Sequence, residues 1–163
     1  MLFLPPNGNG ACGSITEIRK ERRRVYVCEL TIEPKYSEFD MMGIIYHARY
    51  IEWFEQGRLQ LSRNLGFDYF DMEQAGYISP VHEMKVEYKR GIRYGDTVLL
   101  KTRVIENNGV KTAYGYEVYN GEGTLCVEGS SSHYVVRRED FRPVQFKKVF
   151  PEWYAALEEA RKP

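Results

Sequence analysis

One carboxylate, Asp40, stands out because of the residues that follow it. Three residues further on comes Gly43, then two apolar residues, and then Tyr46 and His47. We expect an amphipathic helix to begin at Tyr46 or His47, with the free backbone N–H groups of its first turn directed back toward Asp40. Such a carboxylate could attack a carbonyl or activate water while the N–H groups stabilise the developing negative charge. A capping or turn aspartate has the same pattern, so the chemistry alone leaves both interpretations open.

The element that must position Asp40 is a long helix from about residue 47. Its apolar residues recur at one helical face, and Gly66 follows as a stop signal. The stripe consists of Tyr50, Trp53, Phe54, Gly57, Leu61 and Leu65. A helix of some eighteen residues, about 27 Å long, must bury this stripe against another layer.

Strands are expected to supply that layer. Residues 25–33 have strand composition, and from residue 77 onward the apolar period changes to two, with strands expected around 84–89, 97–105, 111–119 and 124–137. Turns at 107–109 and 120–123 separate the last three, and Pro151 opens a short closing helix. A second short helix is plausible at 67–74. The order β-α-β-β-β-β predicts an α+β domain with an antiparallel sheet.

Composition limits the classes of function. Lysine and arginine total 23, equal to the 23 acidic residues, so a nucleic-acid binder with a dominant basic field is not expected. Three widely spaced cysteines without a C-x-x-C pair favour a reducing compartment over a disulfide framework or zinc site. No stretch approaches the roughly 18 apolar residues of a membrane span. We therefore expect a cytoplasmic protein, with a flexible extension at residues 1–22 and one domain at residues 23–163.

Residues 36–58 resemble the signature of the 4-hydroxybenzoyl-CoA thioesterase-like family. The match covers Asp40, Gly43, the two isoleucines after it, Tyr46, His47 and Tyr50, and the wider similarity extends over about residues 25–153. The resemblance implies the hotdog fold, in which a curved antiparallel sheet wraps a long central helix. It also implies homodimers or homotetramers that hydrolyse thioesters of coenzyme A at subunit interfaces, without a metal or other cofactor.

The resemblance gives the residues of the motif their roles. Asp40 matches the catalytic aspartate, as nucleophile or general base, and the backbone N–H of His47 matches the group that polarises the thioester carbonyl. Gly43 and Tyr46 would shape the pocket. Met41 and Met42 stand where smaller residues are common, and two flexible thioethers there would favour an apolar acyl group.

Other candidates come from the residues alone. Lys89, Arg90 and Arg93 could hold the phosphates of coenzyme A, although a solvated turn explains them equally well. His82 and His133 lack metal-ligand spacing, so no metal site is expected. Glu55 could be a carboxylate that supports the site from two turns along the helix, although an ion pair with Arg58, three residues on, is the commoner arrangement.

The sequence thus predicts an acyl-CoA thioesterase acting on an acyl or aroyl group. Two alternatives remain open: a thioesterase for acyl carrier protein, and a non-catalytic hotdog protein that binds or scaffolds acyl thioesters.

Overall fold

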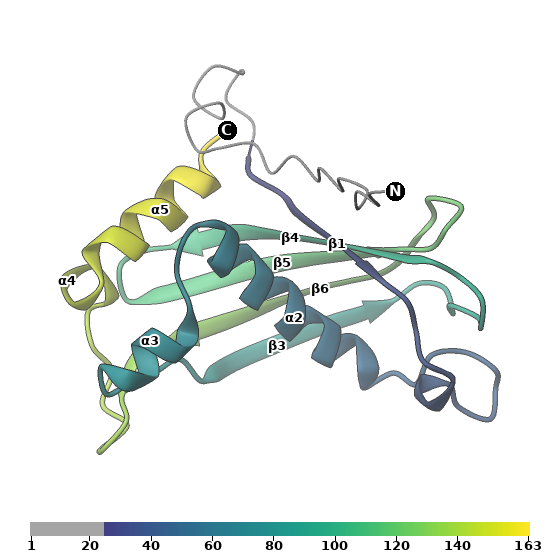
Figure 1. The fold of residues 1–163 in the computed structure, drawn as a ribbon, viewed down its shortest axis with the longest axis horizontal. Coiled ribbons are helices and arrows are strands. Elements are labelled where there is room, and N and C mark those ends of the chain that lie inside the picture. The colour runs from purple at the N-terminus through teal and green to yellow at the C-terminus, as the bar shows by residue number, and fades with distance from the viewer. Residues whose placement is uncertain (1–24) are drawn as a thin grey trace, which may run out of the picture.

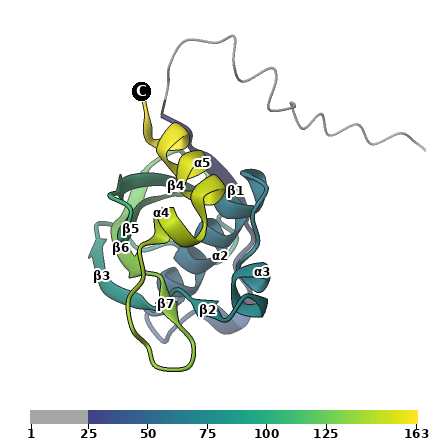
Figure 2. The same cartoon turned by 90° about the vertical axis from the view of Figure 1, so that its left-hand side faces the viewer.

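A five-stranded antiparallel sheet and one long helix form the body of the protein, seen in a computed structural model that describes residues 25–163 (Figure 1). The strand order is β1-β4-β5-β6-β3. The strands are β1 (Cys28–Ile32), β3 (Val81–Tyr88), β4 (Val98–Asn107), β5 (Lys111–Tyr119) and β6 (Leu125–Tyr134). Helix α2 (Arg49–Asn64) lies across one face, and the sheet curves around it (Figure 2). This is the α+β hotdog arrangement that the sequence predicted.

Shorter elements surround this pair. A 3-10 turn η1 (Tyr36–Glu38) precedes α2, and α3 (Tyr69–Gln74) follows it. Strands β2 (Tyr77–Ile78) and β7 (Val136–Arg137) form a second, two-stranded sheet. Helices α4 (Phe146–Val149) and α5 (Pro151–Arg161) close the chain at one end of the large sheet (Figure 1).

The predicted apolar stripe of α2 faces the sheet. Phe54 stacks on Tyr116 of β5, with ring centroids 4.3 Å apart and an interplanar angle of 6°. At Gly57 the helix approaches so closely that an added Cβ would collide with Thr102 Oγ1 and lie 2.8 Å from Leu100 Cδ2. Glycine is therefore required at this position by contact with the sheet rather than by backbone conformation.

Element boundaries differ from the predictions in instructive ways. The helix begins at Arg49, two to three residues later than expected, because residues 47–48 form a turn. The strand expected at 124–137 is interrupted at Val135, and its last residues leave the large sheet to pair with β2. The predicted turn at 107–109 and the helix opened by Pro151 are confirmed. The predicted extension at 1–22 lies outside the described residues.

Strand β3 forms one edge of the large sheet. It pairs with β6 on one side, and no described strand pairs with its other side. The edge is eight residues long and mostly exposed, with Val81 and Tyr88 at its two ends 53% and 48% exposed. A long strand with unpaired backbone groups is a template for pairing with another chain.

Candidate active site

Asp40 lies in a tight loop that its own groups stabilise. Its backbone N–H donates to the carbonyl of Ile44 at 2.9 Å, and its carbonyl accepts from the N–H of Gly43 at 3.0 Å. One carboxylate oxygen, Oδ1, accepts from the backbone N–H of Met42 at 2.8 Å. Gly43 has a φ of 72°, which a side chain would disfavour. The loop therefore fixes the half-buried carboxylate, and no described residue donates to Oδ2.

The loop is held against the segment before β4. We call residues 39–46 the site loop. The N–H of Ile45 donates to the carbonyl of Ile92 at 3.0 Å, and Ile44 forms a β-bridge with Arg93. On the other side, the N–H of Tyr46 donates to the carbonyl of Glu38 at 2.8 Å. These contacts place Asp40 between the sheet end and the start of α2.

The start of α2 offers unpaired donors beside this loop. Its N-cap residue, Ala48, makes no side-chain cap. The Arg49 N–H donates to the carbonyl of Tyr46 at 2.9 Å, whereas the N–H groups of His47 and Ala48 have no acceptor among the described residues. Free N–H groups at a helix start, together with the helix dipole, favour negative charge. The free N–H groups expected beside Asp40 are therefore present, although the helix begins two residues later than expected.

Tyr50, in the first turn of α2, is close enough to Asp40 for the two groups to interact electrostatically. Burial raises the pKa of Tyr50 to about 12, and the negative charge of Asp40 adds to the increase. The ring packs edge-on against Trp53 and Tyr88, with centroids 5.1 and 5.7 Å away. The hydroxyl of Tyr88 donates to the carbonyl of His47 at 3.0 Å. The structure thus brings Asp40, Tyr50 and the His47 backbone into one cluster, attached to the edge strand β3 through Tyr88.

The predicted acyl-binding residues form an exposed apolar surface in the single chain. Met41 is fully exposed, Met42 is 72% exposed and Tyr46 is 43% exposed. The imidazole of His47 is exposed and lies against the Tyr46 ring, with centroids 4.3 Å apart. Next to them, Tyr94 packs edge-on against Phe39, at 5.5 Å between centroids.

The three basic residues after β3 separate into two groups. Lys89 is paired with Glu87 at 2.8 Å and with Glu128 at 3.3 Å, so its charge is largely satisfied. Arg90 and Arg93 are exposed, and no carboxylate of residues 25–163 lies within ion-pairing distance of either. Through its bridge to Ile44, Arg93 lies beside the site loop. Arg90 and Arg93 therefore remain available to an anionic ligand, and Lys89 does not.

The histidines away from the motif do not form a site with Asp40. His82 packs edge-on against Tyr134, at 4.9 Å between ring centroids, and His133 is buried with Nε2 2.8 Å from Ser131 Oγ. Within residues 25–163 no group of three potential ligands could hold a metal ion.

Sequence reasoning missed a buried polar cluster on the second half of α2. Arg58 is 8% exposed, and its Cζ lies 4.8 Å from the centre of the Tyr69 ring. The expected Glu55–Arg58 pair is wrong because Arg58 points into the interior while Glu55 is exposed. The only signal in the sequence was the position of Arg58, one residue after the apolar stripe residue Gly57.

Phenols and hydroxyls complete this cluster. The Tyr69 and Tyr114 hydroxyl oxygens are 3.3 Å apart, and the Tyr116 hydroxyl is 2.7 Å from Ser131 Oγ. Burial and the nearby Arg58 charge lower the pKa of His133 to about 4, so this imidazole is neutral at pH 7. The cluster lies in the interior, on the opposite half of α2 from Asp40, and within it the His133 Nδ1 atom has no hydrogen-bond partner among the described residues.

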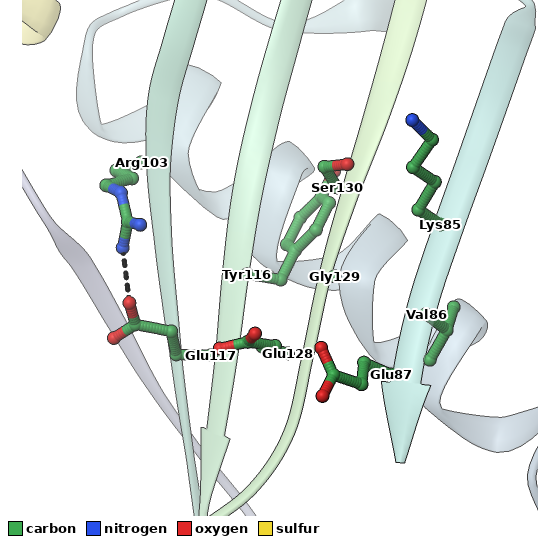
Figure 3. A pocket seen from close by; sticks show the side chains of 9 residues that line it. All are labelled: Lys85, Val86, Glu87, Arg103, Tyr116, Glu117, Glu128, Gly129 and Ser130. Atoms are coloured by element: carbon green, nitrogen blue, oxygen red, sulfur yellow. Dashed lines mark hydrogen bonds and ion pairs between the residues drawn. The ribbon is translucent and has the colours of Figure 1, made fainter. Parts of the chain in front are cut away.

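Two hollows occur on the surface away from the site loop. One, of about 360 Å³, lies on the sheet over small residues of β6, beside the Arg103–Glu117 ion pair of 2.6 Å (Figure 3). The other, of about 570 Å³, lies near Thr31, Thr97 and Asn120. Neither is lined by Asp40 or by the motif around it.

The two thiols of the described chain, Cys28 and Cys126, are free and buried. Both belong to the apolar core. Among the described helices, none has the length and apolar character needed to cross a membrane.

Comparison with known proteins identifies the family. The model of the thioesterase-like superfamily matches residues 35–154. YneP of Bacillus subtilis (strain 168), which is provisionally named an acyl-CoA thioesterase, is 46% identical over 138 residues, covering 85% of this chain and all of YneP.

Solved structures of thioesterases have the same fold as this chain. A DHNA-CoA thioesterase from Staphylococcus aureus has a TM-score of 0.80 and 38% identity, covering 82% of this chain and 90% of that one. Slr0204 from Synechocystis, a 1,4-dihydroxy-2-naphthoyl-CoA thioesterase, has a TM-score of 0.74 at 11% identity, covering 80% of this chain and 95% of Slr0204. At this identity the likeness is one of fold alone. With the family model spanning the site loop, the helix and the sheet, the chain belongs to the thioesterase-like superfamily.

Proposed function

We propose that this protein is an acyl-CoA thioesterase in which Asp40 is the catalytic carboxylate. The observation that carries the proposal is the pairing of a fixed, half-buried carboxylate with free N–H groups at His47 and Ala48. Membership of the thioesterase-like superfamily and the names of its relatives support the reaction class.

In the proposed mechanism, the thioester carbonyl oxygen accepts hydrogen bonds from the backbone at the start of α2. Asp40 either attacks the carbonyl carbon, giving an anhydride that water hydrolyses, or removes a proton from an attacking water. In both routes the C–S bond breaks, the thiolate of coenzyme A leaves, and the acyl group departs as a carboxylate. Each fixed donor to the developing oxyanion contributes about 2.7–4 kcal/mol to the transition state.

The surroundings of Asp40 suggest how the two ends of the substrate bind. Met41, Met42 and Tyr46 present thioether and aromatic surface suited to an apolar or aromatic acyl group. Arg90 and Arg93 offer unpaired charge for phosphates of coenzyme A, with Gly43 giving the site loop its shape. Lys89 is not included in this role because two glutamates already pair with it.

We further propose a homodimer formed through the β3 edge, with a homotetramer as a further possibility. Pairing two copies of β3 would satisfy backbone groups that a monomer leaves exposed, and two-fold symmetry makes such an interface self-complementary. The free thiols of Cys28 and Cys126 agree with a cytoplasmic location.

A panel of thioesters tests the function. Purified protein is mixed with linear acyl-CoAs, benzoyl-CoA and 1,4-dihydroxy-2-naphthoyl-CoA, and with the same acyl groups on acyl carrier protein, while released thiol is measured. We expect rapid release from at least one coenzyme A ester. Release only from the carrier protein would favour the carrier-protein alternative. Binding without release from any thioester would favour the non-catalytic alternative and contradict the proposal.

A further inference from the structure

The loop after β7 carries an unusual exposed aromatic residue. Phe141 is the single non-glycine residue of the described chain with a positive φ, 55°, and it is 63% exposed. A bulky residue in this backbone region is strained, and strain of this kind is concentrated at functional positions. A large ring held in water at a conformational cost suggests that another surface covers it.

The backbone around Phe141 is rigidly organised. We call residues 138–142 the Phe141 loop. The Phe141 N–H donates to the carbonyl of Arg137 at 2.9 Å, and the Arg137 guanidinium donates to both oxygens of Asp140 at 3.2 and 2.8 Å. The same carboxylate accepts from the N–H of Arg142 at 3.1 Å. These hydrogen bonds therefore hold the backbone of the loop, including that of Phe141, in one conformation.

The Phe141 loop lies at the beginning of the edge strand β3. It follows β7, which pairs with β2, and two residues join β2 to β3 at Val81. Figure 2 shows the loop extending below β7 and β2, beyond the β3 edge of the sheet. The Phe141 loop thus lies on the side of the sheet where a second chain would pair.

The candidate active site lies at the other end of the same strand. Tyr88, the last residue of β3, donates to the carbonyl of His47. Antiparallel pairing of two β3 strands about a two-fold axis sets the Val81 end of one copy against the Tyr88 end of the other. The eight residues of β3 span about 24 Å. In such a pair, the Phe141 loop of one copy lies at the Tyr88 end of the other copy's β3, beside the site loop of that copy.

We propose that, in a dimer paired through β3, Phe141 of the second copy covers the exposed Met41 and Met42 and forms one wall of the acyl pocket. A thioether against an aromatic ring is a favourable contact. The arrangement explains why the acyl-binding side of the site loop is open in a single chain. The role in binding acyl groups rests on the proposed thioesterase function, whereas the contact between the two loops rests only on the proposed pairing of two β3 strands.

Cross-linking tests the contact without any enzyme activity. The double variant Met41→Cys with Phe141→Cys is oxidised and separated by non-reducing electrophoresis, next to each single variant. We expect a covalent dimer at high yield in the double variant alone. The control pairs Met41→Cys with Val110→Cys, because Val110 is also an exposed apolar turn residue but lies at the β4–β5 turn. Absence of a covalent dimer, or cross-linking within one chain, would overturn the proposal.

A heterodimer tests the contribution to catalysis. Two differently tagged copies, Asp40→Asn and Phe141→Ala, are co-expressed and purified through both tags. Phe141→Ala homodimers are expected to lose about tenfold in kcat/KM on the best acyl-CoA, whereas Val110→Ala is expected to keep wild-type kcat/KM. The heterodimer then contains one site with both native residues, so it should show half the wild-type activity. Half the Phe141→Ala activity instead would mean that Phe141 acts within its own chain.

Discussion

The polar groups beside the two halves of helix α2 differ in their exposure to solvent. At its start, Asp40 and the His47 backbone lie beside exposed methionines, and part of their hydrogen-bonding capacity is unused. On its second half, Arg58 and His133 are buried among tyrosines and serine. The first group is open to a ligand and a partner, while the second is enclosed by the chain itself.

This difference predicts which substitutions change activity and which change the stability of the fold. A polar group that is satisfied within the fold stabilises that fold, and removing its partners leaves an unpaired buried group at a cost of about 1–3 kcal/mol. A polar group with unused hydrogen-bonding capacity contributes little to the stability of the fold, and its interactions form only when a ligand binds. Substitutions at the helix start should therefore change turnover, and substitutions further along should change stability.

The largest effect is expected from Asp40→Asn. Asparagine can still accept the Met42 N–H, so the loop and the free energy of unfolding should be preserved. Without a carboxylate, kcat/KM should fall about a thousandfold, equivalent to about 4 kcal/mol. Steady-state kinetics together with urea unfolding checks both statements. A folded variant that keeps most of the wild-type rate would remove Asp40 from the mechanism.

Gly57→Ala tests the close packing of α2 on the sheet. The new methyl group would collide with Thr102 and Leu100, and the overpacking should lower the free energy of unfolding by about 3 kcal/mol. Gln56→Ala, on the exposed side of the same helix, is the control and should change stability little. Equal stability of the two variants would show that the helix can shift without loss.

His133 should make stability depend on pH. Its pKa is about 4 in the folded protein and 6.5 in its ordinary state, so the unfolded chain binds more protons between these values. Stability is therefore lost as the pH falls from about 6.5 toward 4, by about 2 kcal/mol between pH 7 and pH 5. Urea unfolding at both pH values should show this loss in the wild type and not in His133→Gln. The same loss in the variant would assign it to other groups.

The smallest effect is expected where β3 touches the site. Tyr88→Phe keeps the ring contact with Tyr50 and removes the hydrogen bond to the His47 carbonyl. We expect kcat/KM to fall a few-fold, about 1 kcal/mol, with stability almost unchanged. Unchanged kinetics would show that the helix start is positioned without this bond.

Much of the fold follows from local patterns in the chain. The α2 stripe, the period-two strands and the turn at 107–109 are set by neighbours in sequence, and the structure confirms them. The pairing of β7 with β2 was not predicted, because interruption of a strand depends on what the sheet meets at its end. The helix α2 begins at Arg49 rather than at Tyr46 or His47, because residues 47–48 form a turn.

The sequence by itself determined the Asp40 motif and the family, because the residue types and spacing of that motif lie within a short continuous segment. Tertiary structure alone decided that Lys89 is already neutralised, that Arg58 is buried over Tyr69, and that Tyr88 supports His47. Each of these depends on contacts between strands and helices distant in sequence. Packing of the sheet around α2 sets such contacts, and residue spacing along the chain does not encode them.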